Sequence, residues 1–209
     1  MSNKEPDTAS QEHKARMQEM KKKQKERVAK AEIERGILIV NTGDGKGKSS
    51  SAFGTAIRAA GHGQSVGIMQ FIKGTWKTGE VEACKRFLEI EHRLSGAGFS
   101  WTTQDLVEAT ASSMNGWEKP KKMIEYCRTD SPAYDLIILD ELNIALRYNY
   151  LDIADVVRVL SAKPEKLNII VTGRDARQEL VEIADTVTDM QMVKHAFEAG
   201  IRAQKGVEF

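Results

Sequence analysis

Residues 37–63 read ILIVNTGDGKGKSSSAFGTAIRAAGHG, and this stretch decides the fold. It begins with an apolar, β-branched run, passes through a loop with three glycines and continues with a helical pattern that ends at two more glycines. Strand, glycine-rich loop and helix, in that order, are what a phosphate-binding loop requires. The sequence therefore predicts that phosphate groups are held where the first strand ends.

The residue types of this loop suit the binding of a nucleotide. Its glycines are expected to take positive φ values and to turn their N–H groups inward, and the helix that follows adds the positive end of its dipole. Lys48 is expected to reach the phosphates, and Ser49 to offer a hydroxyl to a magnesium ion. The residues predicted to hold the nucleotide are Gly43, Asp44, Gly45, Lys46, Gly47, Lys48, Ser49, Ser50 and Arg174.

Four positions in or near the loop leave alternatives open. Thr42 stands where the common pattern GxxxxGK[ST] has its first glycine, so the match is partial. Lys46 is either a second phosphate ligand or a solvated charge. Asp44 places a negative charge beside the nucleotide, so we expect its side chain to point away from the phosphates. Arg174 either stabilises the triphosphate charge or pairs with a nearby acid.

An acidic pair follows the apolar run LIIL at residues 136–139. Asp140 and Glu141 would stand at the carboxyl end of a buried parallel strand, where a magnesium ion needs an anchor. Together with Ser49 they form the predicted site for magnesium or manganese. The alternative is that Glu141 only begins the next helix, since acids favour helix N-termini.

Short β-branched runs alternate with helical patterns after Gly36. Several of these runs are apolar without alternation, which is typical of strands covered by helices on both faces, so the sheet should be mostly parallel. The expected fold class is α/β: a three-layer sandwich with a P-loop, RecA-like nucleotide-binding domain and an N-terminal helical arm. The predicted strands are Ile37–Asn41, Val66–Phe71, Leu88–Leu94, Leu136–Asp140, Asn168–Thr172 and Val187–Val193.

The chain is predicted to have three parts. Residues 1–9 have the composition of a disordered tail, residues 10–35 form a charged helical arm, and residues 36–209 form the nucleotide-binding domain. The arm is read as a solvated helix, as an arm on a partner subunit, or as a contact to nucleic acid. Its interleaved glutamates weaken the last reading.

Composition excludes several classes of protein. With 31 basic and 30 acidic residues among 209, bulk charge does not hold a polyanion. Cys84 and Cys127 show no metal-ligand spacing, which favours a reducing compartment. No apolar run is long enough for a membrane span, and no signal-peptide pattern precedes the arm. We therefore expect a cytoplasmic protein without a membrane or nucleic-acid partner.

Several motifs in a fixed order resemble one family, the ATP:corrinoid adenosyltransferases of the P-loop type. The motifs are GDGKGKSS, QFIKGTW, GAGFSW, LDELN, TGR and VKHAFEAG. The resemblance implies transfer of the 5′-deoxyadenosyl group of ATP to the cobalt(I) of a reduced corrinoid, with release of triphosphate. Such a reaction belongs to adenosylcobalamin biosynthesis or corrinoid salvage.

The same resemblance implies roles for particular residues. The implied catalytic residues are Lys48, Phe99, Trp101 and Glu141. In this family the aromatic pair packs below the corrin and displaces the lower axial ligand, which eases reduction of cobalt(II). Without the resemblance, Phe99 and Trp101 would be read as the core face of a strand or as a loop plug. The chain has Asp44 where the family usually has asparagine and Ser49 where it has threonine.

The implied substrates are ATP and a corrinoid, with magnesium or manganese as cofactor. The implied partners are a second copy of the chain, in a homodimer, and a reduced flavoprotein as electron donor. Two rival functions remain open from the residues alone. One is a hydrolysing ATPase in which Glu141 orients water, and the other is a nucleotide-gated binding module whose arm contacts nucleic acid.

Overall fold

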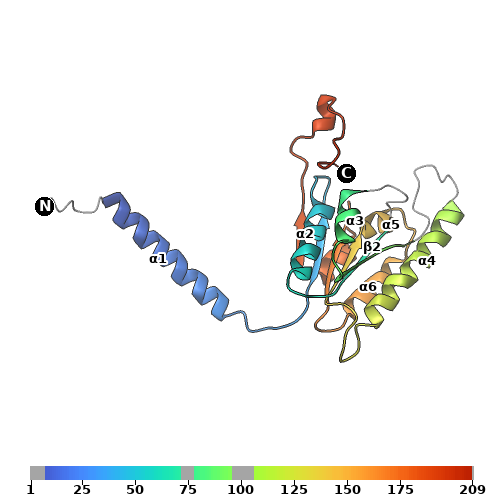
Figure 1. Ribbon diagram of the computed structural model, residues 1–209, viewed down its shortest axis with the longest axis horizontal. Coiled ribbons are helices and arrows are strands. Elements are labelled where there is room, and N and C mark those ends of the chain that lie inside the picture. Colours follow the sequence, from blue (N-terminus) through green and yellow to red (C-terminus); the bar gives the residue numbers. More distant parts are fainter. Residues whose placement is uncertain (1–7, 72–77, 96–105, 209) are drawn as a thin grey trace. The chain divides into compact units, whose positions relative to one another are not determined.

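The computed structural model describes residues 8–71, 78–95 and 106–208 (Figure 1). The chain divides into two compact units, Met1–Glu34 and Arg35–Phe209. No helix among the described residues is both long enough and apolar enough to cross a membrane.

Helix α1 (Thr8–Ala29) is the regular element of the first unit. Its residues from Ser10 onward are exposed, and a Glu19–Lys23 ion pair of 2.7 Å links successive turns. The helix starts within the segment predicted as a disordered tail and ends before Arg35, where the arm was expected to end. A helix without a buried face depends on local propensity alone, so its ends are weakly determined.

The second unit contains a six-stranded sheet in which every neighbouring pair of strands is parallel, in the order β3-β2-β4-β5-β1-β6. The prediction of a mostly parallel sheet is therefore confirmed, and all six predicted runs overlap a strand. The run Val187–Val193 was predicted too long, because strand pairing ends at Asp189. The strands are β1 (Leu38–Thr42), β2 (Val66–Gln70), β3 (Ile90–Leu94), β4 (Leu136–Asp140), β5 (Asn168–Thr172) and β6 (Thr186–Asp189).

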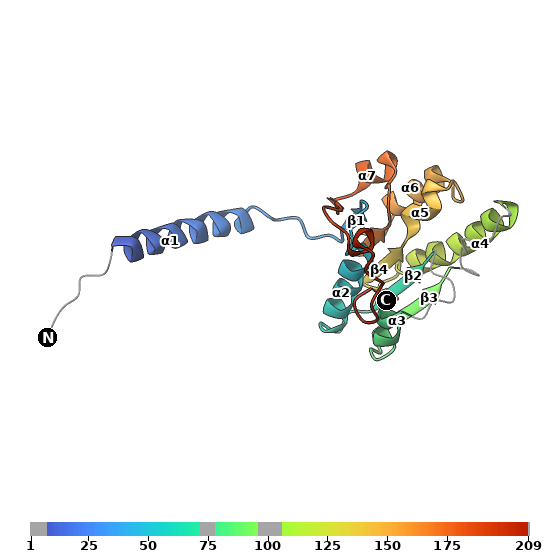
Figure 2. The same cartoon turned by 90° about the horizontal axis from the view of Figure 1, so that it is seen from above.

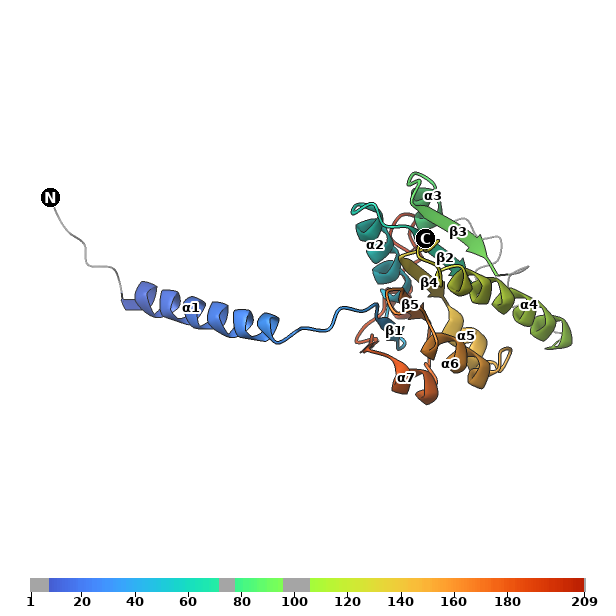
Figure 3. The same ribbon diagram turned by 90° about the horizontal axis from the view of Figure 1, so that it is seen from below.

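Helices cover both faces of this sheet, which confirms the three-layer architecture (Figure 3). One face packs against α2 (Lys48–Ala60) and α3 (Gly79–Cys84). The opposite face packs against four helices, and a short 3₁₀ helix follows β6. These elements are α4 (Leu106–Glu125), α5 (Leu142–Arg147), α6 (Ile153–Ser161), α7 (Gln178–Ile183) and η1 (Ala196–Ala199).

The core explains why the central strands are continuously apolar. Every residue of β2 and β4 is buried, because each strand has a neighbour on both edges and helices on both faces. Alternate residues serve different layers: Ile138 packs on the α2 side, whereas Ile137 and Leu139 pack on the other side. Side chains two residues apart in a strand therefore face the same helices.

All six strands end at one edge of the sheet, since all are parallel. The residues predicted to hold the nucleotide and the cation lie at or just after the ends of β1, β4 and β5, so this edge is where the chemistry must be sought. The segment that follows β6 extends beyond this edge, and the C-terminal turn lies close to α2 and α3 (Figures 1 and 2).

The start of β1 is fastened to the start of β6 by Asp185. Its Oδ2 accepts hydrogen bonds from Arg35 Nη1 at 2.9 Å and from the Leu38 N–H at 2.8 Å, and Asp185 also forms an ion pair with Arg35. The Arg35 hydrogen bond and the Leu38 N–H lower the pKa of the Asp185 carboxyl to about 2. This carboxylate thus joins the first strand of the sheet to its edge strand.

We expect the Asp185→Asn variant to be less stable than the parent at neutral pH, and this deficit to shrink as pH falls from about 4 towards 2. A carboxyl whose pKa is lowered by folding stabilises the folded state above its unfolded pKa and loses that effect through its folded pKa. Urea unfolding at a series of pH values measures the deficit. The exposed Asp130→Asn variant is the control, and an equal deficit at every pH would contradict the expectation.

Candidate functional site

The phosphate loop joins β1 to α2, and two of its glycines have the expected conformation. Gly43 has a φ of 95° and Gly47 a φ of 109°, both in the left-handed region that favours glycine. Gly47 is the N-cap of α2, so the loop delivers its last residues directly to a helix N-terminus. That arrangement suits the binding of an anion.

Gly45 corrects the prediction. Its φ lies outside the left-handed region, and its N–H donates to the Met190 carbonyl instead of pointing inward. A Cβ at this position would lie 2.5 Å from Met190 O and 2.7 Å from Gln191 O. Glycine is therefore needed here for space, because the segment after β6 runs alongside the loop.

Lys48, the first residue of α2, is folded back into the loop. It is 8% exposed, and its ammonium donates to the Gly45 carbonyl. Burial lowers the pKa of Lys48, and Glu141 is near enough to oppose that shift. The structure thus brings Lys48, which follows the phosphate loop, and Glu141, from the acidic pair, close enough for their charges to interact.

The two further basic residues predicted at the nucleotide both have acidic partners. Lys46 pairs with Glu208 near the C-terminus, and Arg174 Nε lies 3.6 Å from Asp44 Oδ1. All four side chains are at least partly exposed, so these ion pairs are weak and can be exchanged for phosphate. Asp44 thus pairs with a residue predicted to hold the nucleotide, and the expectation that its side chain points away from the phosphates stays a prediction.

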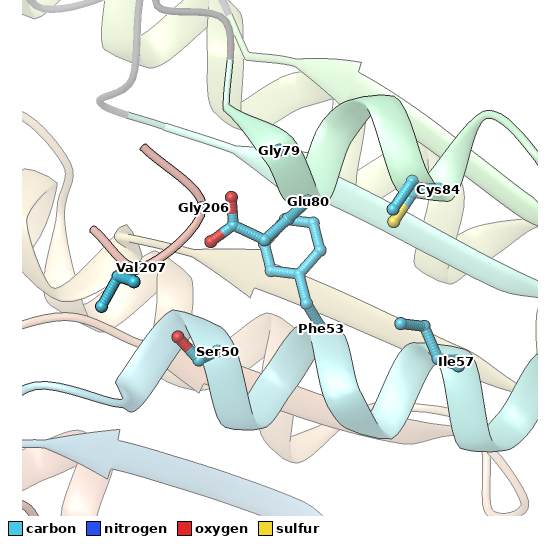
Figure 4. A pocket seen from close by; sticks show the side chains of 9 residues that line it. Ser50, Phe53, Ile57, Gly79, Glu80, Cys84, Gly206 and Val207 are labelled. Carbon is cyan, nitrogen blue, oxygen red and sulfur yellow. The ribbon is translucent and has the colours of Figure 1, made fainter. Parts of the chain in front are cut away.

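Serines occupy the first turn of α2 after Lys48. Ser49 is half-buried and Ser50 is exposed, while Ser51 Oγ accepts from Asn41 Nδ2 at 2.9 Å and so links the helix to β1. Ser50 also lines a cavity of about 360 Å³ between α2, α3 and the C-terminal turn. Figure 4 shows that Phe53 and the Glu80 carboxylate lie at this cavity.

Asp140 is fully buried at the end of β4, and neighbouring strands hold both of its oxygens. Oδ1 accepts from Thr172 Oγ1 at 2.7 Å, and Oδ2 accepts from Gln70 Nε2 at 2.9 Å. None of the ion pairs between described residues involves Asp140. A buried carboxylate with two neutral donors is well suited to a cation.

Glu141 is the N-cap of α5, as the alternative reading of this residue expected, but its conformation is unusual. Its φ of 63° is left-handed, which costs a residue with a side chain about 1–3 kcal/mol. Its N–H donates to Thr172 Oγ1 at 3.0 Å, and its side chain does not cap the helix. Glu141 therefore stands at the start of α5 without its side chain serving as the cap.

Three polar residues at or near this edge were given no role of their own from the sequence, although Gln70 and Thr172 begin the motifs QFIKGTW and TGR. Gln70 ends β2 and contacts Asp140, Thr172 ends β5, and His92 Nε2 lies 2.8 Å from Gln70 Oε1. Burial lowers the pKa of His92, although Asp140 opposes this shift. The available signal was a polar side chain at the end of an otherwise apolar strand, as in VGIMQ at residues 66–70.

The residues at this edge fit a divalent cation that is bound together with a nucleotide. No group of three or more His, Cys, Asp or Glu side chains within the described ranges could hold a metal ion by itself. A cation that binds phosphate oxygens needs only one or two protein oxygens in addition. Ser49, Asp140 and Glu141 offer such oxygens. Phe99 and Trp101 lie outside the described residues.

Comparison with known proteins shows extensive similarity to one family. The model of the family described as ATP:corrinoid adenosyltransferase BtuR/CobO/CobP matches residues 34–209. A corrinoid adenosyltransferase of Pseudomonas aeruginosa is 46% identical over 200 residues, which cover 95% of this chain and 96% of that protein. The corrinoid adenosyltransferase CobA of Salmonella typhimurium is 43% identical over 197 residues, covering 93% and 96%.

A third relative and one solved structure complete the comparison. A corrinoid adenosyltransferase of Escherichia coli K12 is 44% identical over 197 residues, which cover 93% of this chain and 96% of that protein. EssC (ATPases 2 and 3) from Geobacillus thermodenitrificans is 10% identical, with a TM-score of 0.45, and the match covers 82% of this chain and 35% of that chain. The last likeness is too weak to support any conclusion.

We expect Gly45→Ala to weaken ATP binding and to lower the free energy of unfolding by about 1–3 kcal/mol, because the added Cβ collides with the Met190 and Gln191 carbonyls. The matched control is Gly54→Ala, inside α2, where a Cβ meets nothing within 4 Å. That change should stabilise the protein by roughly 0.5–1 kcal/mol. Urea unfolding measures the stability of both variants, and calorimetric titration measures their binding of ATP. A Gly45→Ala protein with the stability and ATP affinity of the parent would contradict the prediction.

Proposed function

The chain belongs to the ATP:corrinoid adenosyltransferase family, and from this premise we propose how the carboxyl edge of its sheet carries out the reaction. The protein is an enzyme that transfers the adenosyl group of ATP to a corrinoid. The hydrolysing ATPase and the nucleotide-gated binding module are not favoured, because the relatives that cover nearly the whole chain are named for adenosyl transfer.

The observation that supports the proposed mechanism is the position of Lys48: it starts α2 directly after the glycine loop, donates to the Gly45 carbonyl and lies near Glu141. In the reaction, cobalt(I) of the corrinoid attacks the ribose C5′ of ATP. A cobalt–carbon bond forms, the C5′–O bond breaks, and triphosphate leaves with the electron pair of that bond. The nucleophile is already electron-rich, so the protein needs no general base and acts by positioning and by stabilising the leaving group.

The chain's own residues would stabilise triphosphate by exchanging partners. We propose that Lys48 moves its hydrogen bond from the Gly45 carbonyl to a phosphate oxygen. Lys46 would leave Glu208 to bind phosphate, and Arg174 would leave Asp44 in the same way. Both ion pairs are exposed and therefore weak. The N–H groups of Gly47 and of the first turn of α2 complete the phosphate contacts, together with Ser50.

We propose that Ser49, Asp140 and Glu141 hold magnesium, or manganese, against the triphosphate. When bound, this cation would neutralise part of the charge that develops on the leaving group. Glu141 lies near Lys48 and follows the buried Asp140 directly, so the cation and the ammonium would face the same phosphates. The proposal is supported by the oxygen atoms that these three side chains offer, because magnesium and manganese prefer oxygen ligands.

Further proposals concern the corrinoid and the state of the protein. We propose that Phe99 and Trp101 pack below the corrin, displace its lower axial ligand and so ease the reduction of cobalt(II) by a reduced flavoprotein. We also propose a homodimer in the cytoplasm. The motif GAGFSW at residues 96–101 supports the first proposal, and the exposed arm α1, which a second subunit could cover, supports the second.

In the decisive assay, the purified protein is incubated in the dark without oxygen with ATP, magnesium and chemically reduced cob(I)alamin. We expect a light-sensitive alkylcobalt product and an equal amount of triphosphate, since both come from cleavage of one C5′–O bond. Corrinoid absorbance and separation of the phosphate products measure them, with a control that omits corrinoid. Orthophosphate from ATP alone, without an alkylcobalt product, would refute adenosyl transfer.

The role of the aromatic pair is tested by the starting oxidation state. We expect Phe99→Ala combined with Trp101→Ala to lose turnover chiefly when the reaction starts from cobalt(II) with a reduced flavin donor. With cobalt(I) prepared chemically, turnover should fall much less, because no axial ligand then has to be displaced. Equal losses of turnover from cobalt(II) and from cobalt(I) would contradict a role of the pair in reduction.

A further inference from the structure

A row of polar side chains crosses four neighbouring strands at the site edge of the sheet. His92 belongs to β3, Gln70 to β2, Asp140 to β4 and Thr172 to β5, which is the order of these strands in the sheet. Each member of the row is hydrogen-bonded to the next, at 2.8, 2.9 and 2.7 Å. The row therefore forms one connected network with Asp140 inside it.

Three members of this row lie on the face of the sheet that α2 covers. Gln70, Asp140 and Thr172 each follow by two residues a side chain that packs on the α2 face, namely Ile68, Ile138 and Ile170. Alternation along a strand then puts the polar residues on that same face. This is the face whose helix α2 begins at Lys48, the residue that follows the glycine loop.

The direction of every hydrogen bond in the row follows from Asp140. An ionised carboxylate only accepts, so Gln70 must turn its NH₂ group towards Asp140 and its carbonyl oxygen towards His92. His92 must then donate from Nε2. Thr172 donates its hydroxyl to Asp140 and accepts from the Glu141 N–H. The orientation of the Gln70 amide is thus set from both sides.

This network holds the Asp140 carboxylate in one orientation. Gln70 is 3% exposed and Asp140 is fully buried, so water does not compete for these bonds. One neutral donor occupies each carboxylate oxygen, which leaves acceptor capacity for a cation on both. Hydrogen bonds from outside the ligand shell that orient a metal ligand typically change metal affinity by about 10–100-fold.

We propose that Gln70, held by His92, is a positioning residue that orients Asp140 for the divalent cation of the bound nucleotide. This inference rests on the proposed cation site. Thr172 has the matching role on the other side of Asp140 and also holds the Glu141 backbone. A Gln70 that served folding alone would affect stability without affecting cation affinity.

The test measures cation binding without the corrinoid and without turnover. Mn²⁺ is titrated into protein with saturating ATP, and free Mn²⁺ is followed by electron paramagnetic resonance. We expect Gln70→Met, which keeps length but loses the donor, to raise the dissociation constant of Mn²⁺ by about 10–100-fold. Gln178→Met, an exposed glutamine of α7, is the matched control and should bind as the parent does.

Two further variants keep the test decisive if Gln70→Met does not fold. Thr172→Val removes the second donor and should also weaken Mn²⁺ binding, whereas Thr172→Ser keeps the hydroxyl and should restore it. Parent-like Mn²⁺ binding by a folded Gln70→Met or Thr172→Val protein would overturn the inference. Absence of ATP-dependent Mn²⁺ binding in the parent would instead overturn the proposed cation site, so the two failures are distinguishable.

Discussion

Parallel pairing of all six strands is the constraint on which the rest of the structure depends. It brings every strand end to the same edge, and it requires helices on both faces to cover strands that are buried throughout. Asp140 ends β4, a central strand, and is buried at this edge. Gln70 and Thr172, from the flanking strands, donate hydrogen bonds to its carboxylate. The strand pairing that builds the sheet therefore also positions this site residue.

The central strands β2 and β4 could be predicted from the sequence because burial on two faces leaves a local trace, a run of mostly apolar residues. The phosphate loop and the acidic pair could be predicted for a similar reason, since each is a short pattern whose chemistry is carried by adjacent residues. The end of α1 at Ala29 could not, because a helix exposed on all sides has no packing to fix its end.

What the sequence could not provide depends on contacts between distant segments. Gln70 and His92 are 22 residues apart, and they meet only because β2 and β3 pair in one particular register. The space requirement at Gly45 comes from Met190, in the segment after β6. In the same way, only the folded chain shows that Lys46 and Arg174 already have acidic partners. The fold was therefore more predictable than the electrostatics of the site.

The contact between Lys46 and Glu208 has a practical consequence for handling the protein. Gly206 and Val207, which precede Glu208, line the same cavity as Ser50 and Phe53. An insertion or a fluorescent label at residues 206–208 would therefore lie next to Lys46 of the phosphate loop, so a dye attached there would respond to changes in the loop.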